Sequence, residues 1–159
     1  MSRVLITGGA SGIGFAMAAG FAEQGDDVWI TDVDETALNA CPEAWQKTRV
    51  DVSNETDMAD LFQQIANKWG GLDAVCANAG IAGPTAKVED VALADWNKCV
   101  EVTLGGTFLT AKYAAPMMKA AGKGAIVITS STVRSPTTSR ITLSLASLSV
   151  SSGFRTLNK

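Results

Sequence analysis

Apolar residues fall into two alternating patterns along this chain. Short continuous runs predict buried strands, and longer stretches with helical spacing predict helices. The predicted strands are Val4–Thr7, Val28–Asp32, Thr48–Val52, Leu72–Ala77 and Gly124–Ser130. The predicted helices are Ile13–Gln24, a short Glu35–Ala40, a segment from Ser53 or Asn54 to Trp69, Leu93–Ala121 and Ser144–Leu157. Such alternation indicates right-handed crossovers and a parallel sheet covered on both faces.

Glycine and proline mark the element ends. Gly25 and Gly70 stand where helices typically end, and Pro116 inside Leu93–Ala121 is expected to kink or divide that helix. The chain has no internal repeat and no low-complexity linker. We therefore expect one domain over residues 1–159, with an α/β, Rossmann-type, doubly wound parallel sheet. The sheet should have about five strands in the order 3-2-1-4-5, in three α/β/α layers.

Composition narrows the classes of function. Of 159 residues, 47% are hydrophobic and 18% are charged, and the net charge is −3. Nothing here favours nucleic acid or an anionic membrane as a partner. The absence of histidine excludes His-based acid–base catalysis, His-ligated metals and Ser-His triads, and we expect no metal site. No apolar run approaches the ~20 residues that a membrane helix needs.

The cysteines indicate a reducing compartment. Cys41, Cys76 and Cys99 lack metal-ligand spacing, and an odd number forms no closed disulfide framework. All three are interpreted as small buried hydrophobic residues. Because the first strand begins near residue 3, no room is left for a signal peptide, and we expect a cytoplasmic protein. The sequon-like Asn54-Glu-Thr56 is interpreted as a chance match.

The first strand leads into the glycine-rich turn Thr7-Gly-Gly-Ala-Ser-Gly-Ile-Gly14 and then into a helix. Gly8 permits a tight turn, Gly12 lets the main chain approach a pyrophosphate, and Gly14 lets the helix pack closely on the sheet. The N–H groups around Ile13 and the positive end of the helix dipole would face the phosphates. The alternative is a glycine-rich turn that holds no ligand.

Asp32 ends the second strand. A carboxylate there can accept hydrogen bonds from both ribose hydroxyls and would repel a 2′-phosphate. No Arg or Lys lies in the glycine-rich turn or in the two positions after Asp32. These residues favour NAD over NADP as cofactor. The alternative is that Asp32 only begins a turn with Asp34.

Two further motifs complete a resemblance to a known family. These motifs are Asp51-Val52 after the third strand and Asn78-Ala79-Gly80 after the fourth. Together with the glycine-rich turn, they make the chain resemble the classical short-chain dehydrogenase/reductase family over almost its whole length. The resemblance implies a nicotinamide-dependent oxidoreductase for a small-molecule carbonyl or alcohol. It also implies that Asp51 and Val52 lie against the adenine, with Ser11 and the Asn78–Gly80 segment near the adenosine ribose.

The catalytic positions depart from the Asn-Ser-Tyr-Lys set of that family. The serine matches Ser131, but the Asn position is Thr103, and the Tyr and Lys positions are Ser144 and Leu148. A tyrosine hydroxyl, with a reference pKa of about 10, can be tuned by an adjacent cation, whereas serine is a far weaker acid. We therefore expect slow or absent turnover, since a missing positioned acid costs about 10²–10⁴-fold in rate.

Other candidates for chemistry are weaker. Tyr113, the only tyrosine, is expected to pack against neighbouring helices rather than to replace the missing acid. The nearby lysines are interpreted as solvated charges: Lys112, Lys119 and Lys123. The hydroxyls of Thr129, Ser130 and Ser131 either hydrogen-bond a carbonyl or cap the end of the fifth strand.

Partners and overall role stay open. The resemblance implies a homo-oligomer through the long helix Leu93–Ala121 and the last helix, whose apolar stripe includes Ile141, Leu145 and Leu148. Alternatively, this stripe packs on its own sheet. The chain also ends early for the family. Three hypotheses remain: an NAD(H)-binding oxidoreductase with impaired turnover, a non-catalytic nucleotide-binding or assembly module, and a truncated product of a longer dehydrogenase.

Overall fold

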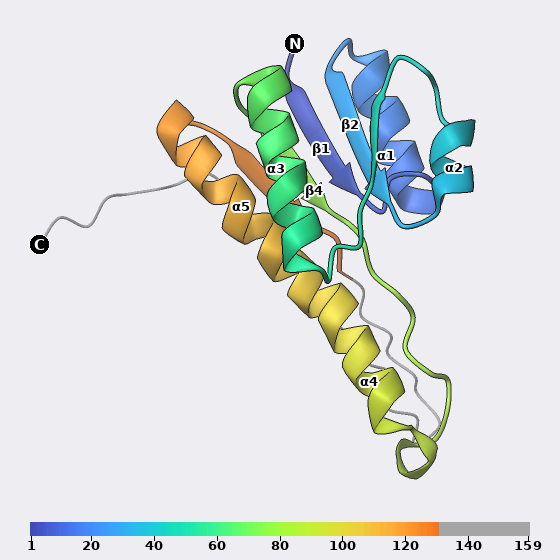
Figure 1. The fold of residues 1–159 in the computed structure, drawn as a ribbon. Helices are drawn as coiled ribbons and strands as arrows, with labels where there is room; N and C mark the ends of the chain where they lie inside the picture. The colour runs from blue at the N-terminus through green and yellow to red at the C-terminus, as the bar shows by residue number, and fades with distance from the viewer. Residues whose placement is uncertain (131–159) are drawn as a thin grey trace, which may run out of the picture.

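The computed structural model describes residues 1–130, in which strands and helices alternate (Figure 1). The strands are β1 (Arg3–Thr7), β2 (Asp27–Asp32), β3 (Gln46–Arg49), β4 (Ala74–Ala77) and β5 (Ala125–Ile128). The helices are α1 (Gly12–Glu23), α2 (Glu35–Ala40), α3 (Glu55–Trp69), α4 (Leu93–Val100) and α5 (Gly106–Ala121). A 3₁₀ turn spans Val88–Asp90, and a π-helical segment spans Glu101–Gly105.

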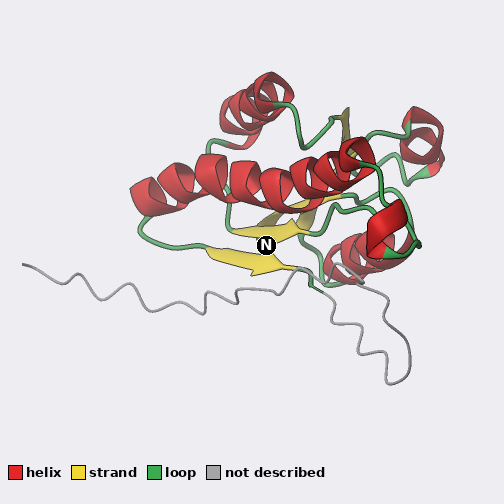
Figure 2. Ribbon diagram, turned by 90° about the horizontal axis from the view of Figure 1, so that it is seen from below, coloured by secondary structure: helices red, strands yellow, loops and turns green. Residues whose placement is uncertain are grey.

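The strands form one parallel sheet in the order β3-β2-β1-β4-β5, which confirms the predicted Rossmann-type α/β fold. Side chains alternate between its faces. On β2, Val28 and Ile30 join the apolar cluster beneath α1 and α2, whereas Trp29 joins the cluster beneath α3 and α5. The helices therefore form a layer on each face (Figure 2). All carboxyl ends of the strands meet along one edge.

The third strand is the clearest error of prediction. The sequence predicts Thr48–Val52, but β3 lies at Gln46–Arg49. Val50 and Val52 are buried beyond the strand end, where they pack into the cluster beneath α3 and α5. Their hydrophobicity therefore reports burial rather than strand pairing. The other strands differ from prediction only at their ends.

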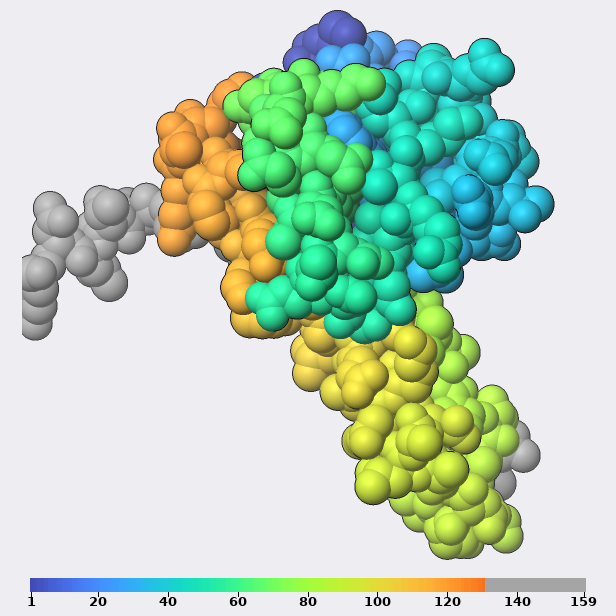
Figure 3. Space-filling model, in the orientation of Figure 1, coloured from blue at the N-terminus to red at the C-terminus, as the bar shows by residue number. Residues whose placement is uncertain are grey.

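The long helical region is divided, but not at Pro116 as the sequence suggests. α5 continues through Pro116 to Ala121, and the division lies at the π-helical segment between α4 and α5. The chain passes close to the core there, because a Cβ at Gly106 would lie 2.6 Å from Val52 Cγ2. Such π-helical turns are frequent at functional sites. α4 and the loop before it project from the body as an arm (Figure 3).

Several local predictions hold. Asn54 caps α3 by accepting the N–H groups of Thr56 and Asp57, and Gly25 and Gly70 adopt positive φ angles of +83° and +68°. The three cysteines are buried free thiols: Cys41, Cys76 and Cys99. Over residues 1–130, no helix combines the length and apolar character needed to cross a membrane. The expected last helix, Ser144–Leu157, and its apolar stripe lie outside the described residues.

Candidate cofactor-binding site

The glycines between β1 and α1 meet different surroundings. Gly8 has a φ of +61°, and a Cβ there would lie 2.9 Å from Ala79 Cα, so this turn contacts the chain after β4. A Cβ at Gly14 would overlap the Gly8 carbonyl oxygen. Gly12 has a φ of +53°, and within residues 1–130 no atom other than those of its chain neighbours and its own helix backbone lies within 4 Å of where its Cβ would be. Gly8 and Gly14 thus pack against protein, whereas Gly12 faces open space.

The start of α1 is exposed and lacks a side-chain cap. Ser11 holds the N-cap position in an extended conformation, but its hydroxyl makes no capping hydrogen bond, and the first turn carries no acidic residue. The first N–H groups of a helix have no partner within it. Ser11, Gly12 and Ile13 are all exposed. This end of α1 therefore offers N–H donors and a positive dipole end, which suit a phosphate.

Asp32 lies at the carboxyl end of β2, beside this turn. Its Oδ2 accepts the N–H of Ala10 at 3.2 Å, and its Oδ1 accepts the N–H of Asp34 at 3.2 Å. The turn with Asp34 is therefore present, but it does not exclude a ribose contact. Each carboxylate oxygen can accept a second hydrogen bond. The two N–H groups orient the half-buried carboxylate at the edge of the sheet.

Thr7 and Asn78 join β1 to the chain after β4. The Thr7 hydroxyl accepts the N–H of Asn78 at 3.0 Å and that of Ala79 at 3.1 Å. The Asn78 amide donates to the carbonyl oxygens of Thr7 and Gly8, both at 3.2 Å. Sequence reasoning does not assign this role to Thr7, which is 1% exposed. A hydroxyl at the last position of a buried apolar strand is the signal that could have found it.

Asp51 and Val52 follow β3 at the same edge. Asp51 Oδ1 accepts hydrogen bonds from the backbone N–H of Ser53 at 2.9 Å and from its hydroxyl at 2.6 Å. The Ser53 hydroxyl holds the pKa of this carboxyl below its ordinary value, although partial burial opposes the effect, and Lys98 and Arg49 contribute as nearby cations. Asp51 therefore keeps its negative charge at neutral pH. Val52 is buried beside it.

Thr103 reaches the turn after β4 from the π-helical segment. Its Oγ1 accepts the N–H of Ile81 at 3.4 Å, and its carbonyl oxygen accepts the Thr107 hydroxyl at 2.8 Å. A Cβ at Gly80 would lie 3.4 Å from Thr103 Cγ2. The structure thus brings Thr103 beside the Asn78–Gly80 segment. The other three predicted catalytic positions lie outside the described residues: Ser131, Ser144 and Leu148.

Arg49 is a residue of this edge that sequence reasoning missed. It ends β3 as the register partner of Asp32, and its Nε donates to the Val33 carbonyl oxygen at 3.2 Å. The observed strand order brings Arg49 beside Asp32, although the two residues lie far apart in the sequence. A basic residue at the end of the third strand is the signal, because β3 pairs with β2.

Tyr113 lies between helices, as predicted. Its ring stacks on Phe62 of α3 with 5.8 Å between centroids, and its hydroxyl donates to Glu55 at 3.3 Å. Lys112 is exposed but forms an ion pair with the same carboxylate. This ion pair lowers the pKa of Glu55 and raises that of Lys112. Tyr113 thus contributes to the contact between α3 and α5.

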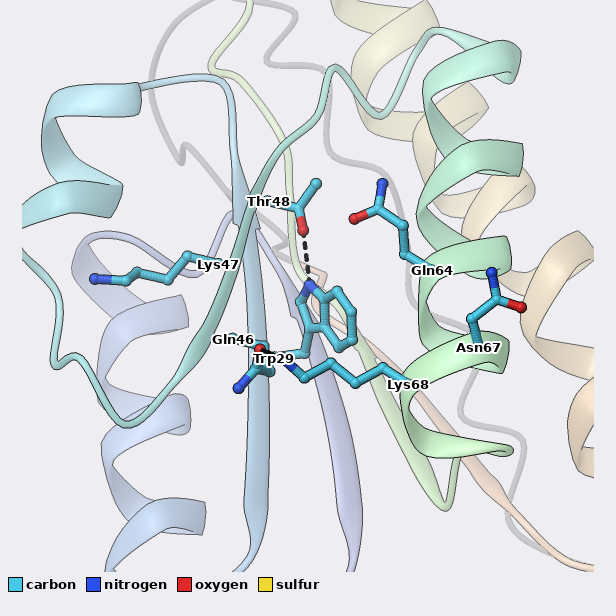
Figure 4. A pocket seen from close by; sticks show the side chains of 7 residues that line it. All are labelled: Trp29, Gln46, Lys47, Thr48, Gln64, Asn67 and Lys68. Atoms are coloured by element: carbon cyan, nitrogen blue, oxygen red, sulfur yellow. Dashed lines mark hydrogen bonds between the residues drawn. The ribbon is translucent and has the colours of Figure 1, made fainter.

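A depression lies away from the predicted site residues, between the β2–β3 pair and the second half of α3 (Figure 4). The indole N–H of Trp29 donates to Thr48 Oγ1 at 2.9 Å at its floor. Its lining residues are Trp29, Gln46, Lys47, Thr48, Gln64, Asn67 and Lys68. As for metals, residues 1–130 contain no group of three or more His, Cys, Asp or Glu side chains that could hold one.

Comparisons with known proteins identify the family. The chain matches the short chain dehydrogenase family over residues 2–142. It is 42% identical over 133 residues to cis-4-hydroxycyclohexanecarboxylate dehydrogenase of Sinomonas cyclohexanicum, which covers 80% of this chain and 53% of that protein. Levodione reductase gives a TM-score of 0.76 at 32% identity, covering 80% of this chain and 53% of its own.

A second similar structure is a complex with a cofactor. It is a 3-ketoacyl-(acyl-carrier-protein) reductase from Brucella melitensis complexed with NADH, with a TM-score of 0.75 and 29% identity. The match covers 80% of this chain and 56% of that one. This chain spans about half the length of the curated relatives it matches. Given the family match over most of its residues, the chain belongs to the short-chain dehydrogenase family.

Proposed function

We propose that this chain binds NAD(H) at the carboxyl edge of its sheet, with NAD preferred over NADP. The observation that carries the proposal is the convergence of an uncapped helix N-terminus, the open Gly12 position and the oriented Asp32 carboxylate at one edge. In open α/β sheets, ligands bind outside the carboxyl ends of the strands. The donor set fits a dinucleotide, since N–H groups suit phosphate and a carboxylate suits ribose hydroxyls.

The proposed cofactor contacts come from the segments that follow β1, β2, β3 and β4. Main chain at Gly8–Gly14 would hold the pyrophosphate, with Ser11 near the adenosine ribose. Asp32 would accept the ribose hydroxyls. Asp51 and Val52 would lie against the adenine, and Asn78, Ala79 and Gly80 would line the ribose while bracing the glycine-rich turn. The bound cofactor would supply or accept a hydride.

The proposed reaction class is redox chemistry on a small carbonyl or alcohol, at an impaired rate. The named activities of the relatives, a dehydrogenase and reductases, support the class. Impairment follows from Ser144 and Leu148, which supply neither the acid nor the cation of the family set. The hydroxyl of Thr103 is engaged with the Ile81 N–H. Restoring the pair as Ser144→Tyr with Leu148→Lys should raise NADH-dependent reduction across a carbonyl panel, and no gain would contradict this explanation.

A calorimetric titration with NAD and NADP tests the cofactor proposal. Asp32→Ala should weaken NAD by about tenfold, through lost hydrogen bonds to a charged acceptor, and should relax discrimination against NADP. Asp34→Asn is the matched control, because Asn keeps the cap of α2. Millimolar or weaker NAD affinity in the parent protein would mean that the glycine-rich turn has a structural role only. If the ratio of NAD affinity to NADP affinity were the same in Asp32→Ala as in the parent protein, Asp32 would not contact the ribose.

A second candidate function is assembly through the long helix. Large apolar side chains are exposed along α4, the π-helical segment and α5: Leu93 at 72%, Trp96 at 42%, Leu104 at 51% and Phe108 at 61%. Exposed apolar patches of this kind mark interaction surfaces. We infer a homo-oligomer whose subunits pair through this surface. Sedimentation should show an oligomer that Leu104→Glu dissociates and Lys119→Glu leaves intact, whereas a monomeric parent protein would contradict the inference.

Domain organisation and compartment complete the proposal. We propose that residues 1–159 form one domain and that the protein is cytoplasmic. Three buried free thiols agree with a reducing compartment. Limited proteolysis tests the first statement, since one domain should resist internal cleavage. Cell fractionation tests the second.

A further inference from the structure

Arg49 occupies the adenosine corner of the candidate site. It is the register partner of Asp32, and neighbouring strands lie about 4.8 Å apart. The hydrogen bond from its Nε to the Val33 carbonyl oxygen, at 3.2 Å, holds the guanidinium beside the residue that directly follows Asp32. The proposed ribose carboxylate and an arginine therefore share this corner.

The terminal amino groups of Arg49 are available to a ligand. A guanidinium carries five N–H donors, and Nε uses one of them. Within residues 1–130, the side chain of Arg49 makes no other hydrogen bond and no ion pair, and it is exposed. Neighbouring cations are engaged, since Lys47 Nζ donates to the Cys41 carbonyl oxygen at 2.9 Å and Lys98 Nζ lies 3.8 Å from Asp51 Oδ2.

The charges at this corner act in opposite directions on a 2′-phosphate. The Asp32 carboxylate repels it, because both groups are negative. The Arg49 guanidinium attracts it and presents planar donors that match phosphate geometry. The field of Arg49 also reaches the adenine side, where it contributes, after the hydrogen bonds from Ser53 and the charge of Lys98, to the lowered pKa of Asp51.

We propose that Arg49 is a specificity-determining residue that binds the 2′-phosphate of NADP, so that the site accepts both dinucleotides and Asp32 sets only a moderate preference for NAD. This inference rests on the NAD(H) site proposed above. It concerns a strand-end residue outside both the glycine-rich turn and the positions that directly follow Asp32.

Calorimetric titration of NADH and NADPH into Arg49 variants tests the inference. The parent protein should bind both, with NADPH weaker. Arg49→Met should lower NADPH affinity about tenfold, the effect of losing a charge-assisted hydrogen bond, with NADH affinity changed by about twofold at most. Arg49→Lys should be intermediate, because an ammonium lacks the planar fork. Lys119→Met, at the far end of α5, removes the same charge and should change neither affinity.

Salt supplies a second readout. Raising the salt concentration should weaken the binding of NADPH more than the binding of NADH in the parent protein. The Arg49→Met substitution should make this difference in salt dependence smaller. If Arg49→Met lowered the affinities for NADH and NADPH by the same factor, or left the ratio of the two affinities unchanged, the proposed role of Arg49 would be overturned. So would a parent protein that binds NADH but not NADPH, and in that case the proposed NAD(H) site would stand. Binding of neither dinucleotide would overturn the site itself.

Discussion

The two edges of the sheet treat their polar groups in opposite ways. At the amino edge, Asp73 accepts hydrogen bonds from the Arg3 backbone N–H at 3.0 Å and from Arg3 Nε at 2.8 Å. Lys123 Nζ lies 3.0 Å from its other oxygen and forms an ion pair with it. Arg3 also donates to the Trp69 carbonyl oxygen at 2.8 Å. Charges at this edge therefore satisfy one another.

The carboxyl edge leaves donors and acceptors open. Within the described part of the chain, the start of α1 has no side-chain cap and Arg49 keeps free donors. Two backbone N–H groups orient Asp32, which forms no ion pair with the described residues. The difference is that charged groups at the amino edge pair with one another, whereas groups at the carboxyl edge are available to the cofactor that we propose.

The largest effect is expected where the open edge is packed most closely. Gly14→Ala should destabilise the fold by about 3 kcal/mol and abolish measurable NADH binding, because the new methyl group overlaps the Gly8 carbonyl oxygen. Gly20→Ala on the same helix is the control, since its Cβ meets open space. This variant should stabilise the fold by up to about 1 kcal/mol, because alanine has the higher helix propensity. Urea unfolding measures both. Equal stability of the two variants would contradict the close packing.

Two buried threonines allow a comparison between a hydroxyl that accepts hydrogen bonds from the chain after β4 and one that is only buried. Thr7 and Thr31 are register partners, and both are almost fully buried. Thr7→Val should cost about 1–2 kcal/mol, because it leaves the partly buried N–H groups of Asn78 and Ala79 without their acceptor. Thr31→Val should be neutral or stabilising, since the Thr31 hydroxyl has no partner within residues 1–130. Thermal unfolding of the two variants gives the comparison, and similar losses would remove the special role of Thr7.

A smaller effect is expected at the closed amino edge, with a defined pH dependence. Hydrogen bonds from Arg3 hold the pKa of Asp73 well below its ordinary value. Asp73 therefore stabilises the fold above its unfolded-state pKa of about 3.9, and this contribution is lost as the pH falls below that value. Asp73→Asn should cost about 1–2 kcal/mol near neutral pH, with little effect on NADH affinity.

Two controls accompany the Asp73 measurement. The stability difference between Asp73→Asn and the parent protein should shrink when urea unfolding is repeated at about pH 3. Lys123→Met should cost at most about 0.5 kcal/mol, because this lysine side chain is 71% exposed. A stability difference that did not change with pH would show that charge on Asp73 contributes nothing.

Sequence patterns predicted the order and pairing of the strands better than the bounds of the elements. Apolar runs alternating with helical patterns were sufficient for the parallel sheet, because its central strands β1, β2 and β4 are buried on both faces. They misplaced β3, since Val50 and Val52 are buried without belonging to the ladder. The sequence also suggested a division of the long helix at Pro116, whereas the helix divides at the π-helical segment Glu101–Gly105. Glycine is the only helix-breaking residue type in that segment.

The candidate site was predictable where it is local. The glycine-rich turn and Asp32 are motifs within a few residues of a strand end, and the structure brings them together. Thr7 and Arg49 carry only a residue type at a strand end as a signal, and their contacts followed from the observed strand order, because their hydrogen-bond partners come directly after other strands. The roles of Ser131, Ser144 and Leu148 remain predictions from family resemblance.

Amide chemical-shift mapping during an NADH titration compares the two edges in one experiment. We expect shifts at the amides of Gly8–Gly14, at Asp32 and Val33, and at Asn78–Gly80, with Arg3 and Asp73 unchanged. Shifts confined to the depression lined by Trp29 and Gln46, or no shift at saturating NADH, would contradict a nucleotide site at the carboxyl edge.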